Sequence, residues 1–281
     1  MLELFYITNN KIEAKIADNL GIDWIFIDLE KIGKEDRQKN RNTVKSEHQI
    51  SDIKVIKSVL SKSKILVRTN PYGEWTREEI AQIANGGHVD MIMLPYFKEL
   101  FEVENFLKIA KEHSLKVALL LETLSGIKIL DKILLLDGID YLHIGLNDIH
   151  IERKTSFMFE PYSDGLIENI VKKLKNKKQK FGIGGIACVS IDILPSAKTI
   201  LIEHYRLGSQ GVILSRTFKP DFETNNLTDF EEKLKISIDL FRREEAIAEE
   251  LSNSEFKQNK LKLDDNIAEV VKTINNKNNE F

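Results

Sequence analysis

The sequence predicts an α/β protein built as a (β/α)8 TIM barrel with a C-terminal helical extension. Eight short apolar runs are each followed by a helical pattern, and this alternation favours a parallel sheet. Eight such units fill about 250 residues, the usual length of this barrel. We expect the barrel over residues 1–226 and the extension over residues 227–281. An open doubly wound sheet is the alternative, although no G-x-G-x-x-G follows the first expected strand.

The first half of the chain supplies five strands, and the second of them is apolar on both faces, as expected for a covered parallel sheet. These strands are expected at residues 2–8, 24–27, 64–67, 90–94 and 117–121. Asn9 is placed to cap the first helix, and Thr76 with Glu79 has the spacing of a capping box. The segment 31–49 is polar and too long for an ordinary connection, which indicates a functional or mobile loop.

The second half supplies the remaining three strands, expected at residues 141–144, within the glycine-dense strand and loop 181–186, and at 211–214. Helices are expected at residues 125–136, 164–178, 195–206 and 227–251. A second long loop is expected at 151–162. Residues 254–281 are rich in Lys, Asn and Asp, which predicts a short helix with a loose end.

Composition limits the classes of partner. The net charge of −3 gives no electrostatic reason to expect nucleic acid or a membrane surface. No apolar run approaches the roughly 20 residues of a membrane span, and the N-terminus lacks the pattern of a signal peptide. The single cysteine, Cys188, cannot form an internal disulfide, which fits the reducing cytoplasm. We therefore expect a cytoplasmic protein that acts on a small molecule.

Polar residues follow most of the expected strands, at the end of the barrel where active sites lie. The residues at these strand ends are Asp28, Glu30, Arg68, Asn70, Pro95, Tyr96, Glu122, Asn147, Asp148, Gly184, Gly185, Ser215 and Arg216, and all but Pro95 and the two glycines have polar side chains. Glu122 and Asp148 end the fifth and sixth strands, which are neighbours in a barrel. Two carboxylates at adjacent strand ends suit a hard divalent cation, although each can instead cap the helix that follows.

Arg68 ends the third strand and has two interpretations. Its guanidinium can bind a substrate carboxylate bidentately, or it can pair with the carboxylates of Asp28 and Glu30. If the second strand continues through residue 30, these two carboxylates point to opposite faces. At most one would then face the barrel axis, and the other would have a structural role.

Three histidines and one glycine pair carry open alternatives. His48, at the end of the first long loop, is either a general base or a surface residue. His143 lies within a strand and is expected to be a core residue, and His150 fits either role. Gly184-Gly185 is either a phosphate cradle or a tight turn.

Five short segments, each at a strand end and in this order, carry a family resemblance. They are Asp28-Leu29-Glu30, Val67-Arg68, Met93-Leu94-Pro95-Tyr96, Leu121-Glu122-Thr123 and Ile144-Gly145-Leu146-Asn147-Asp148. The set resembles the citrate lyase beta-subunit and HpcH/HpaI-type 2-oxo-acid aldolase family, within the phosphoenolpyruvate/pyruvate superfamily of TIM barrels. The resemblance runs from about residue 24 to residue 216.

The resemblance implies a divalent cation, Mg²⁺ or Mn²⁺, with Glu122 and Asp148 as its protein ligands. It implies that Arg68 holds the carboxylate and enolate of a pyruvate-like substrate, with Pro95 and Asn147 as further substrate contacts. The implied chemistry is the reversible cleavage or formation of a carbon–carbon bond. The cation and the guanidinium would stabilise the developing enolate oxygen.

The sequence departs from the family pattern at the general base. The aldolase branch follows its D-x-E segment with a histidine, and here that position is Lys31. His48 is the remaining candidate base because it shares the loop. Asp28 and Glu30 are expected to contact the residues that bind the substrate or the cation, and not the substrate itself. The family resemblance also implies a homo-oligomer, with contacts between subunits through the residues after 227.

The predicted function is therefore that of a metal-dependent carbon–carbon lyase or aldolase acting on a 2-oxo acid or a related acyl compound. One alternative is a phosphate-handling barrel isomerase or synthase, suggested by Gly184-Gly185 and Ser215. The other is a catalytically reduced barrel that binds a metabolite or a partner protein, suggested by Lys31 at the position of the base.

Overall fold

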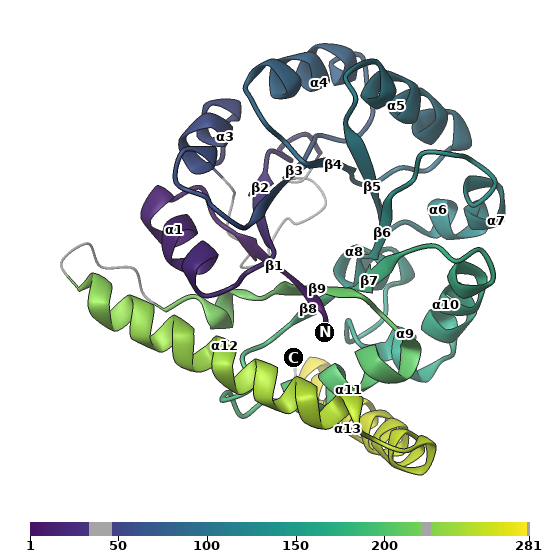
Figure 1. The fold of residues 1–281 in the computed structure, drawn as a ribbon. Helices are drawn as coiled ribbons and strands as arrows, with labels where there is room; N and C mark the ends of the chain where they lie inside the picture. Colours follow the sequence, from purple (N-terminus) through teal and green to yellow (C-terminus); the bar gives the residue numbers. More distant parts are fainter. Residues whose placement is uncertain (34–46, 221–225, 280–281) are drawn as a thin grey trace. The chain divides into compact units, whose positions relative to one another are not determined.

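The computed structural model describes residues 1–33, 47–220 and 226–279, and its elements follow the expected alternation of strands and helices (Figure 1). The chain divides into two compact units, Leu4–Ile144 and Met1–Glu3 with Gly145–Phe281. The expected boundary between a barrel and an extension at residue 226 is a different division, and it stays a prediction.

The unit Leu4–Ile144 contains six parallel strands that pair in chain order. They are β1 (Glu3–Ile7), β2 (Trp24–Asp28), β3 (Lys64–Arg68), β4 (Met91–Leu94), β5 (Lys116–Leu121) and β6 (Tyr141–Ile144). Helices on the outer side of these strands connect them (Figure 1). They are α1 (Lys11–Asn19), α3 (Ile50–Lys57), α4 (Thr76–Asn85), α5 (Leu100–Glu112), α6 (Leu124–Lys128) and α7 (Leu130–Ile133).

The strands of this unit are buried on both faces, as their apolar composition predicts. All five residues of β2 are buried, and aromatic rings fill part of the space beside it. Phe5 stacks on Trp24 with ring centroids 5.7 Å apart and contacts Tyr141 at 5.5 Å. His143 is 1% exposed, and its Nδ1 lies 3.4 Å from the Tyr141 hydroxyl. The expectation that His143 is a core residue is therefore confirmed.

The caps of two helices differ from the expected ones. Asn10, not Asn9, caps α1, because its Oδ1 accepts hydrogen bonds from the backbone N–H groups of residues 12 and 13. Helix α4 begins at Thr76 as expected, but without a capping side chain. The Glu79 carboxylate instead accepts hydrogen bonds from Asn70, so the predicted capping box is wrong.

Asp18, near the end of α1, ties this helix to the turn before β3. Its buried carboxylate accepts hydrogen bonds from the backbone N–H groups of Ser61, Lys62 and Ser63 at 2.9, 2.8 and 2.7 Å. The Ser61 hydroxyl donates a fourth at 2.6 Å. Burial alone would raise the pKa of Asp18, but these hydrogen bonds hold it below its ordinary value.

The second unit holds the last strands, β7 (Phe181–Ile183), β8 (Gly185–Ile186) and β9 (Gly211–Leu214). Gly184 interrupts the expected seventh strand because its φ is +52°. A Cβ at this position would lie 2.8 Å from Cδ1 of Leu146. Both constraints require glycine, and they favour the tight-turn interpretation of Gly184-Gly185 over the phosphate cradle.

Helices make up most of this unit. They are α8 (Leu146–Arg153), α9 (Glu160–Ser163), α10 (Leu166–Asn176), α11 (Ala197–Leu207), the short 3-10 helix η1 (Arg216–Phe218), α12 (Leu227–Glu249) and α13 (Asn253–Asn279). The loop expected at 151–162 is thus partly helical. The prediction of a short helix in residues 254–281 is also wrong, because α13 has 27 residues. Asn259 anchors it to α11 by donating to the Thr199 carbonyl at 3.0 Å.

The first residues of the chain are held by α12. The backbone N–H of Leu2 donates to the buried carboxylate of Glu245, and Arg242 donates to the Leu2 carbonyl at 2.9 Å. Glu3 forms an ion pair with Lys180 at 2.9 Å. Residues 2 and 245 are separated by 243 positions in the chain, yet they lie in one compact unit.

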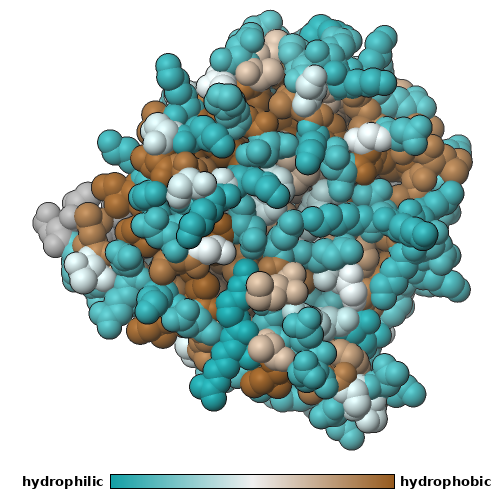
Figure 2. All heavy atoms as spheres, in the orientation of Figure 1, coloured by the Kyte–Doolittle hydropathy of each residue, from teal (hydrophilic) through white to brown (hydrophobic). Residues whose placement is uncertain are grey.

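Parallel strands alternating with helices, followed by two long C-terminal helices, confirm the predicted fold class of a (β/α)8 barrel with a helical extension. No helix in the described ranges is both long and apolar enough to cross a membrane. Hydrophilic and apolar residues are interspersed on the face that Figure 2 shows.

Candidate functional site

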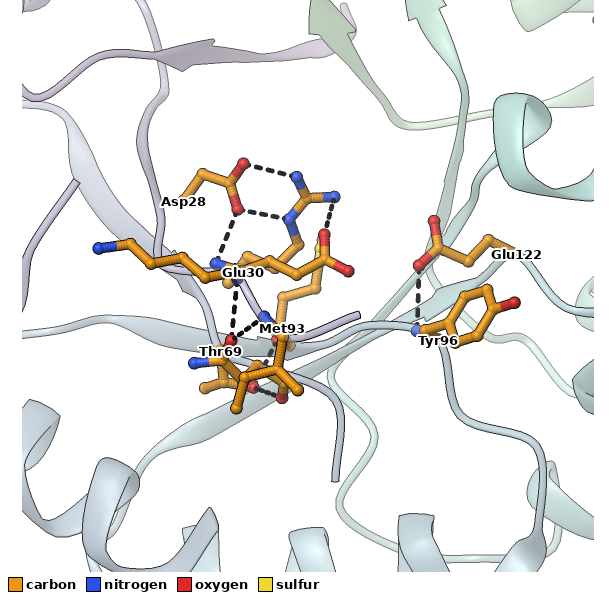
Figure 3. Close-up of polar contacts among 10 residues, drawn as sticks. Asp28, Glu30, Thr69, Met93, Tyr96 and Glu122 are labelled. Carbon is orange, nitrogen blue, oxygen red and sulfur yellow. Dashed lines mark hydrogen bonds and ion pairs between the residues drawn. The ribbon is translucent and has the colours of Figure 1, made fainter. Parts of the chain in front are cut away.

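Arg68 connects the ends of β2 and β3. It is the register partner of Asp28, so the two side chains leave neighbouring strands at the same level. Nε and Nη2 donate to the two Asp28 carboxylate oxygens at 2.8 and 2.7 Å. Nη1 lies 3.5 Å from a carboxylate oxygen of Glu30 (Figure 3). This arrangement corresponds to the ion-pair interpretation of Arg68.

Asp28 and Glu30 both reach this guanidinium, although strand alternation would separate them. Strand β2 ends at Asp28, so Glu30 lies beyond the strand. The alternation of side chains between the two faces of a strand therefore does not apply to Glu30. Both residues are buried, with exposed fractions of 4% and 3%. The structure therefore brings together the two carboxylates that were expected to support the site.

The electrostatics of the cluster keep Arg68 protonated. Burial alone would lower the pKa of the guanidinium, but Asp28, Glu30 and Glu122 together raise it above its ordinary value. Nε and Nη2 donate to Asp28, and Nη1 lies within ion-pair distance of Glu30. The edge formed by Nε and Nη2 is thus committed to Asp28.

His48 lies at the end of β2. The residue is 8% exposed, and its Nδ1 accepts a hydrogen bond from the Asp28 backbone N–H at 2.9 Å. An imidazole nitrogen that accepts from an N–H carries no proton, so the neutral ring bears its proton on Nε2. His48 is therefore a buried neighbour of the cluster and not a surface residue. The rest of this loop, residues 34–46, lies outside the described residues.

Asn70 fixes the backbone that follows Glu30. Its side-chain oxygen accepts hydrogen bonds from the N–H groups of Lys31 and Ile32 at 2.9 and 3.0 Å. Its side-chain nitrogen donates to Glu79 at 2.7 Å, and its backbone N–H donates to the same carboxylate at 3.2 Å. We name this arrangement the Asn70 clamp. Burial raises the pKa of Glu79, while the bonds from Asn70 oppose the shift.

Glu122 directly follows β5 and is 4% exposed. One of its carboxylate oxygens, Oε1, accepts a hydrogen bond from the Tyr96 backbone N–H at 3.0 Å (Figure 3). Tyr96 follows the buried Pro95 at the end of β4, and its φ is +51°. The predicted metal ligand is thus a buried carboxylate with a fixed orientation.

The other predicted ligand and the last predicted substrate contact belong to the second compact unit. Asp148 and Asn147 lie in the first turn of α8, after Gly145. Asp148 is buried, with 9% of its surface exposed. The joint binding of a cation by Asp148 and Glu122 stays a prediction. His150 lies in the same helix, and its Nδ1 is 2.9 Å from the Thr155 hydroxyl, which gives it a structural partner.

The available groups fit a hard divalent cation. Both predicted ligands are carboxylates, the donor type that Mg²⁺ and Mn²⁺ prefer. No group of three or more His, Cys, Asp or Glu side chains in the described ranges forms a ready-made metal site. Mg²⁺ commonly binds through one or two carboxylates while water and substrate oxygens complete its coordination. Glu122 and Asp148 each offer one carboxylate of this kind.

Solved structures share this fold at low sequence identity. An HpcH/HpaI aldolase from Desulfitobacterium hafniense is 13% identical with a TM-score of 0.57, over 90% of this chain and 94% of that chain. The citrate synthase SbnG is 13% identical with a TM-score of 0.56, over 85% and 92%. A 3-hexulose-6-phosphate synthase from Salmonella typhimurium is 14% identical with a TM-score of 0.54, over 85% and 100%. Identities this low establish the fold alone.

The sequence itself identifies the family. No curated protein matches the chain. The profile of the HpcH/HpaI aldolase/citrate lyase family matches residues 2–192, which is most of the chain and includes all five segments at the strand ends. The chain therefore belongs to the HpcH/HpaI aldolase/citrate lyase family.

Proposed function

We propose that this member of a lyase and aldolase family cleaves or forms a carbon–carbon bond in a small 2-oxo acid, or a related acyl compound, with a divalent cation. The observation that carries the proposal is the protonated Arg68 guanidinium, held among buried carboxylates in a family member of this fold. Family membership supports the reaction class, and the carboxylate donors support the cation.

Glu122 and Asp148 would hold Mg²⁺ or Mn²⁺. When bound, the cation would supply Lewis acidity that polarises the 2-oxo group of the substrate. Arg68 would bind the substrate carboxylate through its Nη1–Nη2 edge, because Asp28 occupies the other edge. Asp28 and Glu30 fix the direction of that edge, so little ordering is left for the moment of reaction. Pro95 and Asn147 are the further proposed substrate contacts.

His48 is the proposed base, and its geometry sets a condition on that role. Its Nδ1 lone pair accepts the Asp28 N–H, and Nε2 bears the proton of the neutral ring. To take a proton from the substrate, the ring must first release the Asp28 N–H. We therefore propose that substrate binding turns the His48 ring away from the end of β2.

His48→Asn tests this role because an asparagine side-chain oxygen can replace Nδ1 as the acceptor. The Asp28 N–H would keep its partner while proton transfer is lost. We expect the turnover number to fall by about 100-fold, the low end for general base catalysis, with little change in thermal stability. Unchanged turnover would reduce His48 to a structural role.

We also propose a homo-oligomer that works in the cytoplasm. Two long C-terminal helices leave large apolar side chains exposed, among them Ile236 and Leu261 at 58% and 66%, and the single cysteine is unpaired. A monomer by light scattering would contradict the oligomer.

The decisive experiment measures pyruvate release from 4-hydroxy-2-oxo acids, with Mg²⁺, with Mn²⁺ and with EDTA. We expect metal-dependent release that Glu122→Ala abolishes. Glu78→Ala is the matched control, since Glu78 is an exposed glutamate that contacts only Gln82 among its described hydrogen bonds. Turnover in EDTA, or turnover by Glu122→Ala, would contradict the proposal. Binding of Mn²⁺ and pyruvate without turnover on any substrate would indicate a catalytically reduced barrel.

A further inference from the structure

Five described residues other than glycine have φ in the left-handed region, and one of them is unlike the rest. The five are His88, Tyr96, Ser114, Lys154 and Lys178. Three lie at the C-terminal end of a helix, where a left-handed residue ends the helix and allows its last carbonyls to be satisfied. His88 lies beyond α4 and follows the left-handed Gly87. Tyr96 instead follows a strand, so helix termination does not explain its conformation.

The conformation of Tyr96 is costly for its residue type. A left-handed φ brings Cβ too close to the backbone, and only Gly, with Asn and Asp less often, adopts it readily. Strain of this kind persists where the surrounding structure demands it, and it concentrates at functional sites. Tyr96 has a φ of +51° between β4 and α5. A contact of Tyr96 with the surrounding structure must therefore stabilise this conformation.

The reason lies in the direction of its backbone N–H. The N–H of Tyr96 donates to Oε1 of Glu122 at 3.0 Å, across 26 positions of the chain. Figure 3 shows the Tyr96 nitrogen facing the carboxylate while the ring points to the side. The ammonium of Lys98 lies 4.7 Å from the centroid of that ring. The left-handed turn thus directs a main-chain donor at the carboxylate proposed to bind the cation.

We propose that Tyr96 is a positioning residue whose backbone N–H fixes the Glu122 carboxylate for binding a divalent cation. The inference rests on the proposed function of Glu122. A hydrogen bond to Oε1 holds one oxygen and sets the plane of the carboxylate, so the orientation of the second oxygen is determined before the cation arrives. Partners that orient metal ligands typically change metal affinity by 10- to 100-fold when they are removed.

The test removes the N–H and keeps the side chain. The tyrosine α-hydroxy acid, introduced at position 96, replaces the peptide N–H by an ester oxygen. Mn²⁺ binding is measured by titration calorimetry without substrate. We expect affinity to fall by about 10-fold, the lower end for such partners. If the ester protein does not fold, Tyr96→Gly is the second variant: it keeps the N–H and readily adopts a left-handed φ, so we expect Mn²⁺ affinity within a few-fold of the unmodified protein. A 10-fold loss in this variant would overturn the backbone role.

The matched control is the same ester replacement at Lys98. Its backbone N–H also donates to a glutamate, Glu102, at 2.6 Å in the same connection, but outside the proposed site. We expect this variant to bind Mn²⁺ as the unmodified protein does. An equal loss of affinity at both positions would mean that any ester in this connection weakens binding, and would overturn the inference.

Two further comparisons separate this inference from the proposed function. Glu122→Ala must abolish Mn²⁺ binding if Glu122 is a ligand. If it does, and the ester at position 96 binds normally, only the role of Tyr96 is refuted. If Glu122→Ala binds Mn²⁺ normally, both proposals fail. Tyr96→Ala keeps the N–H, so a loss as large as that of the ester would assign the effect to the ring and refute the backbone role.

Discussion

Replacing Asn70 by aspartate tests how the backbone after β2 is held. In the Asn70 clamp, the side-chain oxygen accepts two N–H groups, and the side-chain nitrogen donates to Glu79 at 2.7 Å. Aspartate keeps the acceptor, because one carboxylate oxygen takes the place of the amide oxygen. It loses the donor and places a second carboxylate against Glu79. The substitution therefore turns the attractive contact with Glu79 into a repulsive one and keeps the two hydrogen bonds from the N–H groups of Lys31 and Ile32.

The expected loss of stability follows from that single contact. A hydrogen bond to a charged group contributes about 1.5–3 kcal/mol, and the repulsion between the buried Glu79 carboxylate and the new part-buried one adds to its loss. We expect the free energy of unfolding to fall by about 3 kcal/mol at pH 8. Burial already raises the pKa of Glu79, and a second carboxylate beside it would raise that pKa further.

The stability loss in Asn70→Asp should increase with pH. A carboxyl whose pKa is raised in the folded state contributes stability below its unfolded pKa of about 4, and that contribution is lost as pH rises through the folded pKa. The loss in Asn70→Asp should therefore be small near pH 4 and grow by about 1.4 kcal/mol per pH unit until the raised pKa is reached.

Guanidinium unfolding at pH 4.5 and pH 8, followed by circular dichroism, measures this difference. Asn70→Ala is the control, since it removes the hydrogen bonds without adding charge, and its loss should vary less with pH. If Asn70→Asp loses the same stability at both pH values, the electrostatic reasoning about Glu79 is wrong.

Three other substitutions have defined outcomes. Gly184→Ala should lower the free energy of unfolding by more than about 1 kcal/mol, because φ is +52° and the new Cβ would meet Leu146; an unchanged melting temperature would contradict this. Asp18→Asn should be destabilising at neutral pH. The difference in free energy of unfolding between wild type and Asp18→Asn should shrink below about pH 4, where the wild-type carboxylate loses its own contribution. A difference that stays constant during acid titration would contradict this. Arg68→Lys cannot make both bonds to Asp28 and should cost about 3 kcal/mol in denaturant unfolding; wild-type stability would show that the pair is dispensable.

The sequence predicts the strands well because their signal is local. Trp24 to Ile27 are apolar at every position, and such a run can be buried only within a covered sheet. The same runs locate Arg68, the last residue of β3, and Glu122, the first residue after β5. The position of a residue at a strand end follows directly from the end of the apolar run. Strand ends therefore identify which side chains meet, here Asp28 with Arg68, but not how they are paired.

The remaining features depend on contacts between distant segments. The sequence places Tyr96 and Asn70 at strand ends without a role, since nothing in an aromatic residue signals a left-handed φ. Glu79 fits a capping box locally, yet the carboxylate binds Asn70 instead. His48 is separated from Asp28 by 20 positions, so only the structure shows that they meet. Hydrogen bonds between distant segments decide these cases, and the local sequence does not reveal them.

The attachment of Leu2 to α12 has a consequence for synthesis on the ribosome. Residues 4–144 form one continuous stretch, so this unit can begin to fold while the chain is still growing. Leu2 must wait for Arg242 and Glu245, which emerge roughly ten to fifty seconds later at ordinary translation rates. Leu2 is thus among the last residues to reach its native partners, whereas β1, which follows it, can pair with β2 much earlier.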